Sequence, residues 1–270
     1  MTAHPRRVLL TGASGGIGSA FLKALAREGM RTMGVARRPP QTTDTPGAPS
    51  RRQPVVWQQA DLTRSDDIAR VASTATAWGV DTVVHAAGIP SFGAVEDLAA
   101  DEAAALLQLN LWSPMVLTQA LLPHLKSLPE ARIVFVGSAL GRIGVPGSAL
   151  YGASKAGLHR FAEALRRELS GTRVRVQWLG PRATRTAFNS PANESFNRAT
   201  GTASDPPQVV ADALMALLRS GAAERHVGFP ERLAVRLNGA LGPWLDAGFH
   251  KHRDALLPTH PQDLTAGNTP

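Results

Sequence analysis

Short apolar runs alternate with longer segments of helical period along most of the chain, and this rhythm restricts the fold more than any other feature. Runs such as TVVH and IVFVG, which begin at Thr82 and Ile133, are almost entirely apolar, as expected of strands covered on both faces. Because strands and helices alternate, the connections should be right-handed crossovers between parallel strands. The predicted fold is therefore α/β, with a doubly wound parallel sheet.

The apolar runs and helical periods predict the bounds of individual elements. The predicted strands are Arg7–Thr11, Arg31–Ala36, Val55–Gln59, Asp81–His85, Arg132–Val136 and Arg173–Leu179. The predicted helices are Ile17–Glu28, Ser65–Trp78, Asp101–Leu122 and Ala149–Leu169. Two segments lack periodicity: Pro39–Pro54 is predicted to be an exposed loop, and Arg182–Pro207 is predicted to be either a mobile lid or an ordinary long loop.

The alternation of predicted strands and helices indicates a single domain, predicted as residues 1–230. Residues 231–257 are predicted to form an amphipathic C-terminal extension, a broken helix with apolar and basic faces that Pro243 interrupts. Such a segment can pack on the domain or on a second subunit, or it can lie on an anionic membrane surface. Residues 258–270 are predicted to be a disordered tail.

Composition excludes several classes of function. The chain has no cysteine, so disulfides, thiolate nucleophiles and zinc–thiolate sites are excluded, and no metal site is predicted. Its net charge of +8 comes from scattered arginines without interleaved aromatic residues, which argues against a nucleic-acid partner. No apolar run approaches the roughly 18 residues of a membrane span, and the N-terminus does not resemble a signal peptide. We therefore expect a cytoplasmic protein with, at most, peripheral membrane contact.

The sequence TGASGGIG, residues 11–18, lies where the first strand ends and the first helix begins. A pyrophosphate needs free backbone N–H groups, a helix N-terminus and no obstructing Cβ, and Gly12, Gly16 and Gly18 can meet these needs. An ordinary tight turn also uses glycine, and the spacing differs from G-x-G-x-x-G. The position in the first strand–turn–helix unit favours dinucleotide binding.

The end of the second strand bears on which dinucleotide binds. Enzymes that favour NAD usually place a carboxylate there for the ribose 2′-hydroxyl, whereas an arginine accommodates a 2′-phosphate. Here Ala36 is followed by Arg37 and Arg38, with no carboxylate within reach along this stretch. Unless these are merely two solvated arginines, they favour NADP(H) over NAD(H).

Tyr151 and Lys155 are four residues apart and should face the same way on a helix. A phenol with a pKa near 10 becomes a better acid–base catalyst when a neighbouring ammonium lowers that pKa. Ser138 closes an apolar strand thirteen residues before Tyr151, at the edge where open α/β sheets bind ligands. Asn110 ends the run ALLQLN inside a predicted helix, where a polar residue can also satisfy the helix locally.

Taken together, TGASGGIG, HAAG, Asn110, GSALGRIG and YGASK resemble, in this order and spacing, the short-chain dehydrogenase/reductase family over roughly residues 6–230. The resemblance implies a Rossmann fold. It also implies that Tyr151 donates or accepts the proton, that Lys155 lowers the tyrosine pKa and binds the nicotinamide ribose, and that Ser138 polarises the carbonyl. Asn110 would hold a water that links Lys155 to solvent.

The same resemblance implies a set of cofactor-binding residues that follows the dinucleotide from one end to the other. These residues are Gly12, Ser14, Gly16, Ile17 and Gly18 at the pyrophosphate; Arg37 and Arg38 at a 2′-phosphate; Asp61 and Leu62 at the adenine; Ala87 and Gly88 at the adenosine ribose; and Tyr151, Lys155, Pro181 and Thr186 at the nicotinamide end.

Four features depart from the family pattern. HAAG replaces the usual NNAG, so Ala86 lacks an amide that commonly ties neighbouring strands. Arg182 stands where glycine is usual; it is predicted to steer an anionic substrate, to pin the lid, or to be a plain surface residue. Trp112 and Ser113 follow Asn110, where small residues often occur. The C-terminus lacks the Asp-Gly-Gly ending of many β-ketoacyl carrier-protein reductases.

The sequence thus predicts an NADP(H)-dependent oxidoreductase that interconverts a carbonyl and an alcohol by hydride transfer. Its substrate would be a ketone, an aldehyde or a secondary alcohol. A lipophilic or acyl substrate is favoured, because the residues expected to border the pocket are mostly apolar. These residues are Phe92, Leu140, Ile143, Val145 and Phe188. The alternatives are a 3-oxoacyl-thioester reductase and, from another class, a non-catalytic NADP(H) sensor. We expect a homo-oligomer, either a dimer or a tetramer.

Overall fold

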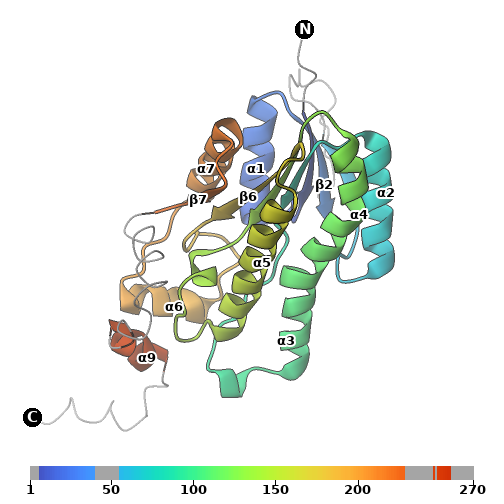
Figure 1. The fold of residues 1–270 in the computed structure, drawn as a ribbon. Coiled ribbons are helices and arrows are strands. Elements are labelled where there is room, and N and C mark those ends of the chain that lie inside the picture. Colours follow the sequence, from blue (N-terminus) through green and yellow to red (C-terminus); the bar gives the residue numbers. More distant parts are fainter. Residues whose placement is uncertain (1–5, 40–54, 229–245, 247, 257–270) are drawn as a thin grey trace, which may run out of the picture.

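Parallel strands hydrogen-bonded into one sheet organise the structure (Figure 1). The structure is a computed structural model that describes residues 6–39, 55–228, 246 and 248–256. Seven strands form one sheet in the order β3-β2-β1-β4-β5-β6-β7, and all six pairings are parallel. The strands are β1 (Arg7–Thr11), β2 (Arg31–Ala36), β3 (Val56–Gln59), β4 (Thr82–His85), β5 (Ala131–Val136), β6 (Val174–Gly180) and β7 (Glu224–His226). The predicted doubly wound parallel sheet is confirmed.

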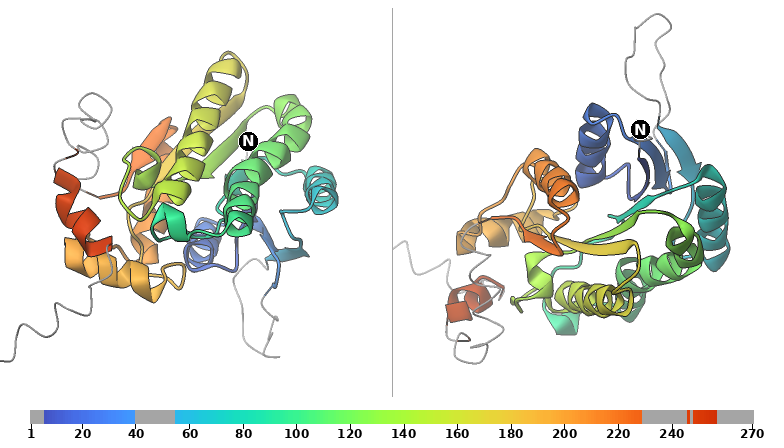
Figure 2. Two further views of the ribbon diagram at one scale, coloured as in Figure 1. Left: turned by 90° about the horizontal axis from the view of Figure 1, so that it is seen from below. Right: turned by 45° about the horizontal axis from the view of Figure 1, so that its top comes forward.

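Helices cover both faces of the sheet (Figures 1 and 2). Helices α1 (Gly16–Arg27) and α7 (Pro207–Ser220) pack against each other on one face. The other face carries α2 (Ser65–Trp78), α4 (Ser113–Ser127) and α5 (Ala149–Glu168). Shorter elements complete the described chain: η1 (Val95–Asp97), α3 (Ala100–Leu107), η2 (Gln108–Trp112), η3 (Ala139–Gly141), α6 (Pro191–Thr200) and α9 (His250–Leu256).

Successive strand residues point to opposite faces, so each strand supplies two cores. In β1, Leu9 packs on the side of α2, α4 and α5, whereas Val8 and Leu10 pack on the side of α1 and α7. Strand β5 repeats the pattern, with Ile133 and Phe135 on the first side. Apolar residues at every strand position are therefore what a sheet between two helical layers requires.

Apart from the short helices η1 and η3, the differences from the predicted elements concern α7, β7 and α6. Helix α7 and strand β7 were not predicted. The signal for α7 was present, because Val210, Leu214 and Leu217 recur at helical spacing and are fully buried. Strand β7, by contrast, is only ERH and has no apolar run. The segment Arg182–Pro207, predicted as irregular throughout, contains helix α6, which Ser190 caps by accepting a hydrogen bond from the backbone N–H of Asn193.

The predicted helix Asp101–Leu122 is three consecutive helical pieces, α3, η2 and α4, of which η2 is a π-helix. This stretch, Ala100–Ser127, is the one described helix that is long and apolar enough to span a membrane. Its residues Leu106, Leu117 and Leu121 are nevertheless at most 1% exposed, and the latter two belong to the core beneath α2 and α5. In this structure it is a core helix.

Of the predicted C-terminal extension, residues 231–257, the structure describes only residues 246 and 248–256, and the predicted tail 258–270 lies outside the described residues. The loop predicted over Pro39–Pro54 also lies outside them, apart from Pro39. Helix α9 packs against α6 (Figure 1).

The scattered arginines are used structurally at the edge of the sheet where the strands begin. Arg7 donates to the carbonyl of Trp78 at the end of α2, and Arg132 donates to the carbonyl of Leu218 near the end of α7. Carbonyls at helix C-termini lack partners within the helix, and a cation suits the negative end of the dipole. Part of the excess positive charge therefore serves the fold.

Thr11 ties β1 to the chain that leaves β4. Its Oγ1 accepts hydrogen bonds from the backbone N–H groups of Ala86 and Ala87, at 3.0 and 3.1 Å. These two residues lie in the HAAG motif, where the side-chain amide usual at position 86 is missing. The tie between the strands is thus supplied by the Thr11 hydroxyl.

We expect Thr11→Val to lower the free energy of unfolding by about 1–3 kcal/mol, because two partly buried N–H groups lose their acceptor while side-chain shape is kept. Urea unfolding followed by circular dichroism measures this loss. Thr74→Val is the matched control: Thr74 is an exposed helix residue whose hydroxyl donates to the Arg70 carbonyl, and its loss should change stability by no more than about 0.5 kcal/mol. Equal effects of the two substitutions would contradict this account.

Candidate active site

The glycine-rich turn leaves no room for side chains. Gly12 has φ +67°, and a Cβ there would lie 2.8 Å from the carbonyl oxygen of Ala86. A Cβ on Gly18 would lie 2.1 Å from the Gly12 carbonyl oxygen, so α1 packs directly on the turn. Gly15 caps α1 without a side-chain hydrogen bond, and the first turn of α1 carries no acidic residue. The turn therefore presents backbone N–H groups and the positive end of a helix, which suits a pyrophosphate.

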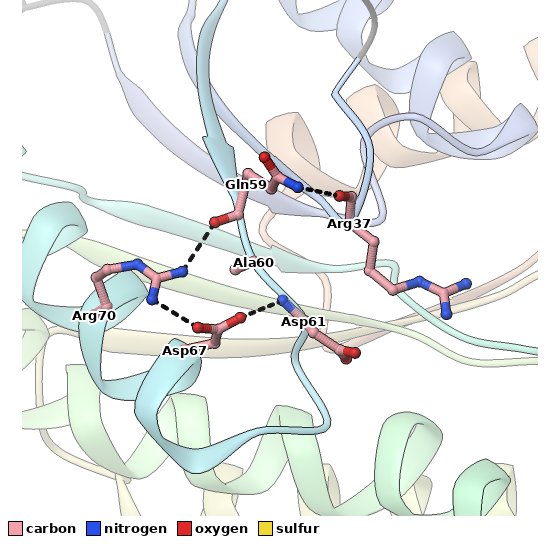
Figure 3. Close-up of a pocket in the computed structure, with 6 residues that line it drawn as sticks. All are labelled: Arg37, Gln59, Ala60, Asp61, Asp67 and Arg70. Atoms are coloured by element: carbon pink, nitrogen blue, oxygen red, sulfur yellow. Dashed lines mark hydrogen bonds and ion pairs between the residues drawn. The ribbon is translucent and has the colours of Figure 1, made fainter.

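The predicted adenosine end lies at the carboxyl ends of β2 and β3. Arg37 and Arg38 are exposed and, with Ser14 and Gln59, line a cavity of about 470 Å³. Arg37 also lines an adjoining cavity of about 410 Å³ together with Asp61 (Figure 3). The remaining residues around this second cavity are Gln59, Ala60, Asp67 and Arg70, none of which was predicted.

Asp61 and Asp67 are held by hydrogen bonds. The backbone N–H and hydroxyl of Thr63 bind Asp61 at 3.0 and 2.8 Å, and these bonds, assisted by the charge of Arg37, lower the pKa of Asp61. Asp67 accepts a hydrogen bond from the Asp61 N–H and pairs with Arg70, both at 2.6 Å (Figure 3). Along the sequence no carboxylate is close to Arg37, but the fold brings Asp61 near it. Leu62 is buried in the core beside Asp61.

Ser138, Tyr151 and Lys155 meet where the chain after β5 contacts the start of α5. The Ser138 side chain lies close enough to Tyr151 to lower the pKa of its phenol. The Ser138 Oγ accepts a hydrogen bond from the Leu140 N–H at 3.1 Å. The Lys155 Nζ lies 5.8 Å from the Tyr151 ring centroid and donates to the Val136 carbonyl at 3.2 Å. A Cβ on Gly141 would lie 2.9 Å from backbone atoms of Lys155. Glycine at 141 thus lets this loop lie directly on α5.

Burial dominates the titration of the tyrosine and the lysine. It raises the pKa of Tyr151, and the neighbouring Ser138 side chain opposes that rise. Burial also lowers the pKa of Lys155 to about 8, since its side chain is 4% exposed and away from water. The resemblance implied that Lys155 lowers the tyrosine pKa, and this effect stays a prediction.

Asn110 lies in the π-helix η2 and is 1% exposed. Its Oδ1 accepts from the Ile89 N–H and its Nδ2 donates to the Ile89 carbonyl, both at 2.9 Å. Nδ2 also lies 3.3 Å from the Ser154 Oγ on α5. Asn110 therefore joins the chain after β4 to the helix of Tyr151 and does not simply satisfy its own helix. A π-helical turn is common at functional sites.

Gly88, predicted beside the cofactor, lies between these groups. A Cβ on Gly88 would be 3.0 Å from the Asn110 Oδ1 and 3.7 Å from the Lys155 Nζ. Ala87, the preceding residue, is held by Thr11 and borders Gly12. The predicted residues after β1, β4 and β5 are therefore contiguous in space.

The segment after β6 folds over this site. The carbonyl of Pro181 accepts from the Ala139 N–H at 2.8 Å, beside Ser138. Thr186 lies against the glycine turn, because a Cβ on Gly16 would be 2.5 Å from its Cγ2. Ile17, next to Gly16, packs against the core shared by α1 and α7. The Phe188 ring stands edge-on to the Tyr151 ring, with centroids 5.9 Å apart.

Arg182 pins this segment at its base. Its Nε and Nη2 donate to the two carboxylate oxygens of Asp205, at 2.9 and 2.8 Å. The backbone of Asp205 also bonds the carbonyl of Ala183 and the N–H of Arg185. Of the roles predicted for Arg182, this ion pair matches pinning of the lid. Asp205 was not identified from the sequence, because it lies 23 positions away.

A second group of aromatic residues forms a wall that joins Phe92 to helices α6 and α9. Phe92 packs edge-on against Phe196 of α6, with ring centroids 5.0 Å apart, and Phe196 in turn contacts His252 of α9 at 5.8 Å. Phe92 was predicted to border the pocket, whereas Phe196 and His252 were not. Leu256 of α9 reaches the same wall beside Gly147.

Comparison with known proteins agrees with this geometry. The model of the short chain dehydrogenase family matches residues 6–197. An uncharacterized oxidoreductase of Bacillus subtilis, YxnA, is 26% identical over 274 residues, spanning 96% of this chain and 76% of that relative. A short chain dehydrogenase from Burkholderia cenocepacia in complex with NADP is 26% identical, with a TM-score of 0.77 over 93% of this chain and 99% of its own. A relative from Burkholderia phymatum in complex with NAD, 20% identical, shares the fold, with a TM-score of 0.78 over 90% and 96% of the two chains.

The lowered pKa of Lys155 predicts how stability changes with pH. Between pH 8 and the unfolded value of 10.5 the unfolded chain binds the lysine proton more tightly, so stability should rise with pH in this window. We expect the free energy of unfolding, measured with urea, to gain about 1–2 kcal/mol between pH 7.5 and 9.5 relative to Lys155→Met. Lys126→Met, which removes an exposed lysine, should keep the wild-type gain. The same gain in Lys155→Met would rule out Lys155 as its source.

Proposed function

This chain belongs to the short-chain dehydrogenase/reductase family, and on that premise we propose that it is an NADP(H)-dependent oxidoreductase that interconverts a carbonyl and an alcohol. The observation that carries the proposal is the convergence of Ser138, Tyr151 and Lys155 beside a glycine turn without obstructing side chains. Oxidoreductase activity follows from the family. The substrate, the preference for NADP(H) and the roles of individual residues are our proposals.

The residues proposed to hold the dinucleotide fit its parts. Gly12, Gly16 and Gly18 let the turn pack closely, because a Cβ on any of them would collide with neighbouring protein atoms, and Ser14 and Ile17 complete the turn. Asp61 and Leu62 would border the adenine, Ala87 and Gly88 the adjacent ribose, and Pro181 and Thr186 the nicotinamide. When bound, the dinucleotide supplies or accepts the hydride.

The protein's own part in the reaction is proton transfer. During reduction the Tyr151 hydroxyl donates its proton to the carbonyl oxygen, and during oxidation it removes the proton from the alcohol. Ser138 orients the reacting oxygen and, from its place beside Tyr151, makes the phenol more acidic. The Lys155 Nζ lies 5.8 Å from the centroid of the Tyr151 ring, and its ammonium can return a proton to the phenol. Asn110 hydrogen-bonds Ser154, the residue before Lys155 on α5, and so helps to hold the lysine in place. The Asn110 Oδ1 can accept a second hydrogen bond besides that of the Ile89 N–H. We propose that the water linking Lys155 to solvent binds there.

Two charges support the preference for NADP(H). Arg37 and Arg38 both reach the cavity beside Ser14, next to the glycine turn, and two guanidinium groups outweigh the single carboxylate of Asp61. Guanidinium groups bind phosphate in a two-pronged geometry. Among the relatives, one is known with NADP and another with NAD.

Aromatic side chains support a lipophilic or acyl substrate, since Phe188 stands against Tyr151, and Phe92, which packs against Phe196, lies beside Gly147 just before α5. A cytoplasmic location, a homo-oligomer and peripheral membrane contact through the C-terminal segment also remain proposals. Most of that segment lies outside the described residues.

Tyr151→Phe tests the reaction and separates an enzyme from a sensor. With NADPH and a panel of ketones, aldehydes and acyl thioesters, we expect turnover to fall at least about a hundredfold, because the proton donor is removed. The dissociation constant for NADPH, measured by fluorescence, should stay within about twofold. Phe161→Leu, a change in the core of α5, is the control and should keep most of the activity. Undiminished turnover in Tyr151→Phe would overturn the mechanism, and a wild type inactive on the whole panel would favour the sensor.

Arg37→Ala tests the cofactor preference. Loss of a charge-assisted hydrogen bond to the 2′-phosphate should weaken NADPH binding about ten- to a hundredfold and leave NADH binding nearly unchanged. Arg70→Ala is the matched control, because Arg70 lines the same cavity but is already paired with Asp67 and the Gln59 carbonyl. Fluorescence titrations with both dinucleotides provide the measurement. An unchanged ratio of the two affinities in Arg37→Ala would remove Arg37 from the 2′-phosphate site.

A further inference from the structure

A charged cluster that the proposed reaction does not use lies on the α5 side of the sheet edge. Its centre is Glu224 in the edge strand β7, next to β6. The Glu224 carboxylate lies 3.2 Å from the His159 Nε2, 3.4 Å from the Arg166 guanidinium and 3.7 Å from that of Arg142; His226 is also 3.7 Å away. We call these five residues the Glu224 cluster. They come from three parts of the chain: the loop after β5, helix α5 and strand β7.

His159 connects the members of the cluster. It is 2% exposed, and its Nε2 lies 2.9 Å from the Arg142 Nη1 as well as 3.2 Å from the Glu224 Oε1. Either tautomer satisfies Nε2: when protonated it donates to Glu224, and when unprotonated it accepts from Arg142. The hydrogen bond with His159, together with the nearby His226 and Arg142, holds the pKa of Glu224 well below its usual range, so its negative charge persists at neutral pH.

The cluster is joined to the loop of Ser138 at two points. Arg142 lies at the end of η3, four residues after Ser138. On the other side, the His159 ring stands edge-on to Trp178 at 4.7 Å, and Trp178 covers Gly137, where a Cβ would lie 1.8 Å from the indole. The chain is thus fixed on both sides of Ser138: Gly137 lies under Trp178 of β6, and Arg142 contacts His159 of α5.

Helix α5 carries the other half of the proposed machinery. His159 lies one turn beyond Lys155 and two turns beyond Tyr151 on this helix. The loop already touches α5 at Gly141, which leaves no gap at Lys155. The Arg142 contacts with Glu224 and His159 add a second attachment, which resists sliding or lifting of the loop along the helix.

We propose that Arg142 is a positioning residue, which holds the loop of Ser138 against helix α5 through Glu224 and His159 and so keeps Ser138 beside Tyr151. The assignment rests on the proposed function for its effect on turnover, but the placement of Ser138 beside Tyr151 exists independently of any reaction. Without this attachment the loop shifts and Ser138 moves away from the phenol.

Arg166 provides a matched control for Arg142. The two side chains are 31% and 28% exposed, and each contributes one guanidinium to the same carboxylate. Arg166 lies in the last turn of α5, away from Tyr151, and has no contact with the loop of Ser138 among the interactions described. Arg142→Met and Arg166→Met should therefore lower stability to a similar extent but differ at the active site.

The readout uses the fact that Tyr151 is the only tyrosine in the chain. With tyrosine labelled by ¹³C at Cζ, the protein gives one resonance, whose position reports hydrogen bonding of the phenol. We expect Arg142→Met to move this resonance toward its position in Ser138→Ala, and Arg166→Met to leave it in place. In turnover, Arg142→Met should lower kcat about ten- to a hundredfold with KM for NADPH nearly unchanged, whereas Arg166→Met should keep kcat within about twofold.

The outcomes separate this inference from the proposed function. Equal resonances and equal kcat values in the two variants, or an unmoved resonance in Arg142→Met, would overturn the positioning role. If the wild type turns over no substrate, the proposed function fails while the resonance still decides the role of Arg142. Should Arg142→Met not fold, Arg142→Lys keeps the charge without the planar fork, and it should shift the resonance in the same direction by a smaller amount.

Discussion

The parallel direction of all seven strands is the constraint on which the rest of the structure depends. Parallel pairing brings the carboxyl ends of all the strands to one edge, and many of the candidate residues directly follow a strand end at that edge. The glycine turn follows β1, the arginines follow β2, Asp61 follows β3, Gly88 follows β4 and Ser138 follows β5. Segments that are far apart in the sequence therefore meet in one site at this edge of the sheet.

Much of this arrangement could be predicted, because it depends on local patterns. Apolar runs and helical periods gave most strands and helices nearly to the residue, as with β1 and α2. The glycine turn and the spacing of Ser138, Tyr151 and Lys155 were also visible in the sequence. Helix α7 was missed although its period was present, whereas β7 was missed because three residues without an apolar pattern carry no strand signal.

What could not be predicted depends on contacts across long stretches of chain. Asp205 closes on Arg182, Phe196 meets Phe92, and Glu224 gathers cations from two other elements. Each residue taken alone looks like a solvated charge or a core aromatic, because the partner is set by the sheet order and not by spacing. The proximity of Asp61 to Arg37 could not be predicted for the same reason, since β2 and β3 become neighbours only in the folded sheet.

The π-helical turn η2 has a consequence for how this chain can vary over evolutionary time. It contains one residue more per turn than the helices on either side, so α3 and α4 each face the core correctly only because that residue is there. Deletion of a single residue would rotate everything beyond it by about 100°, and either Asn110 or the buried Leu117 and Leu121 would turn away from their partners. Side chains at the exposed positions of this helix are free to drift, but its length is fixed.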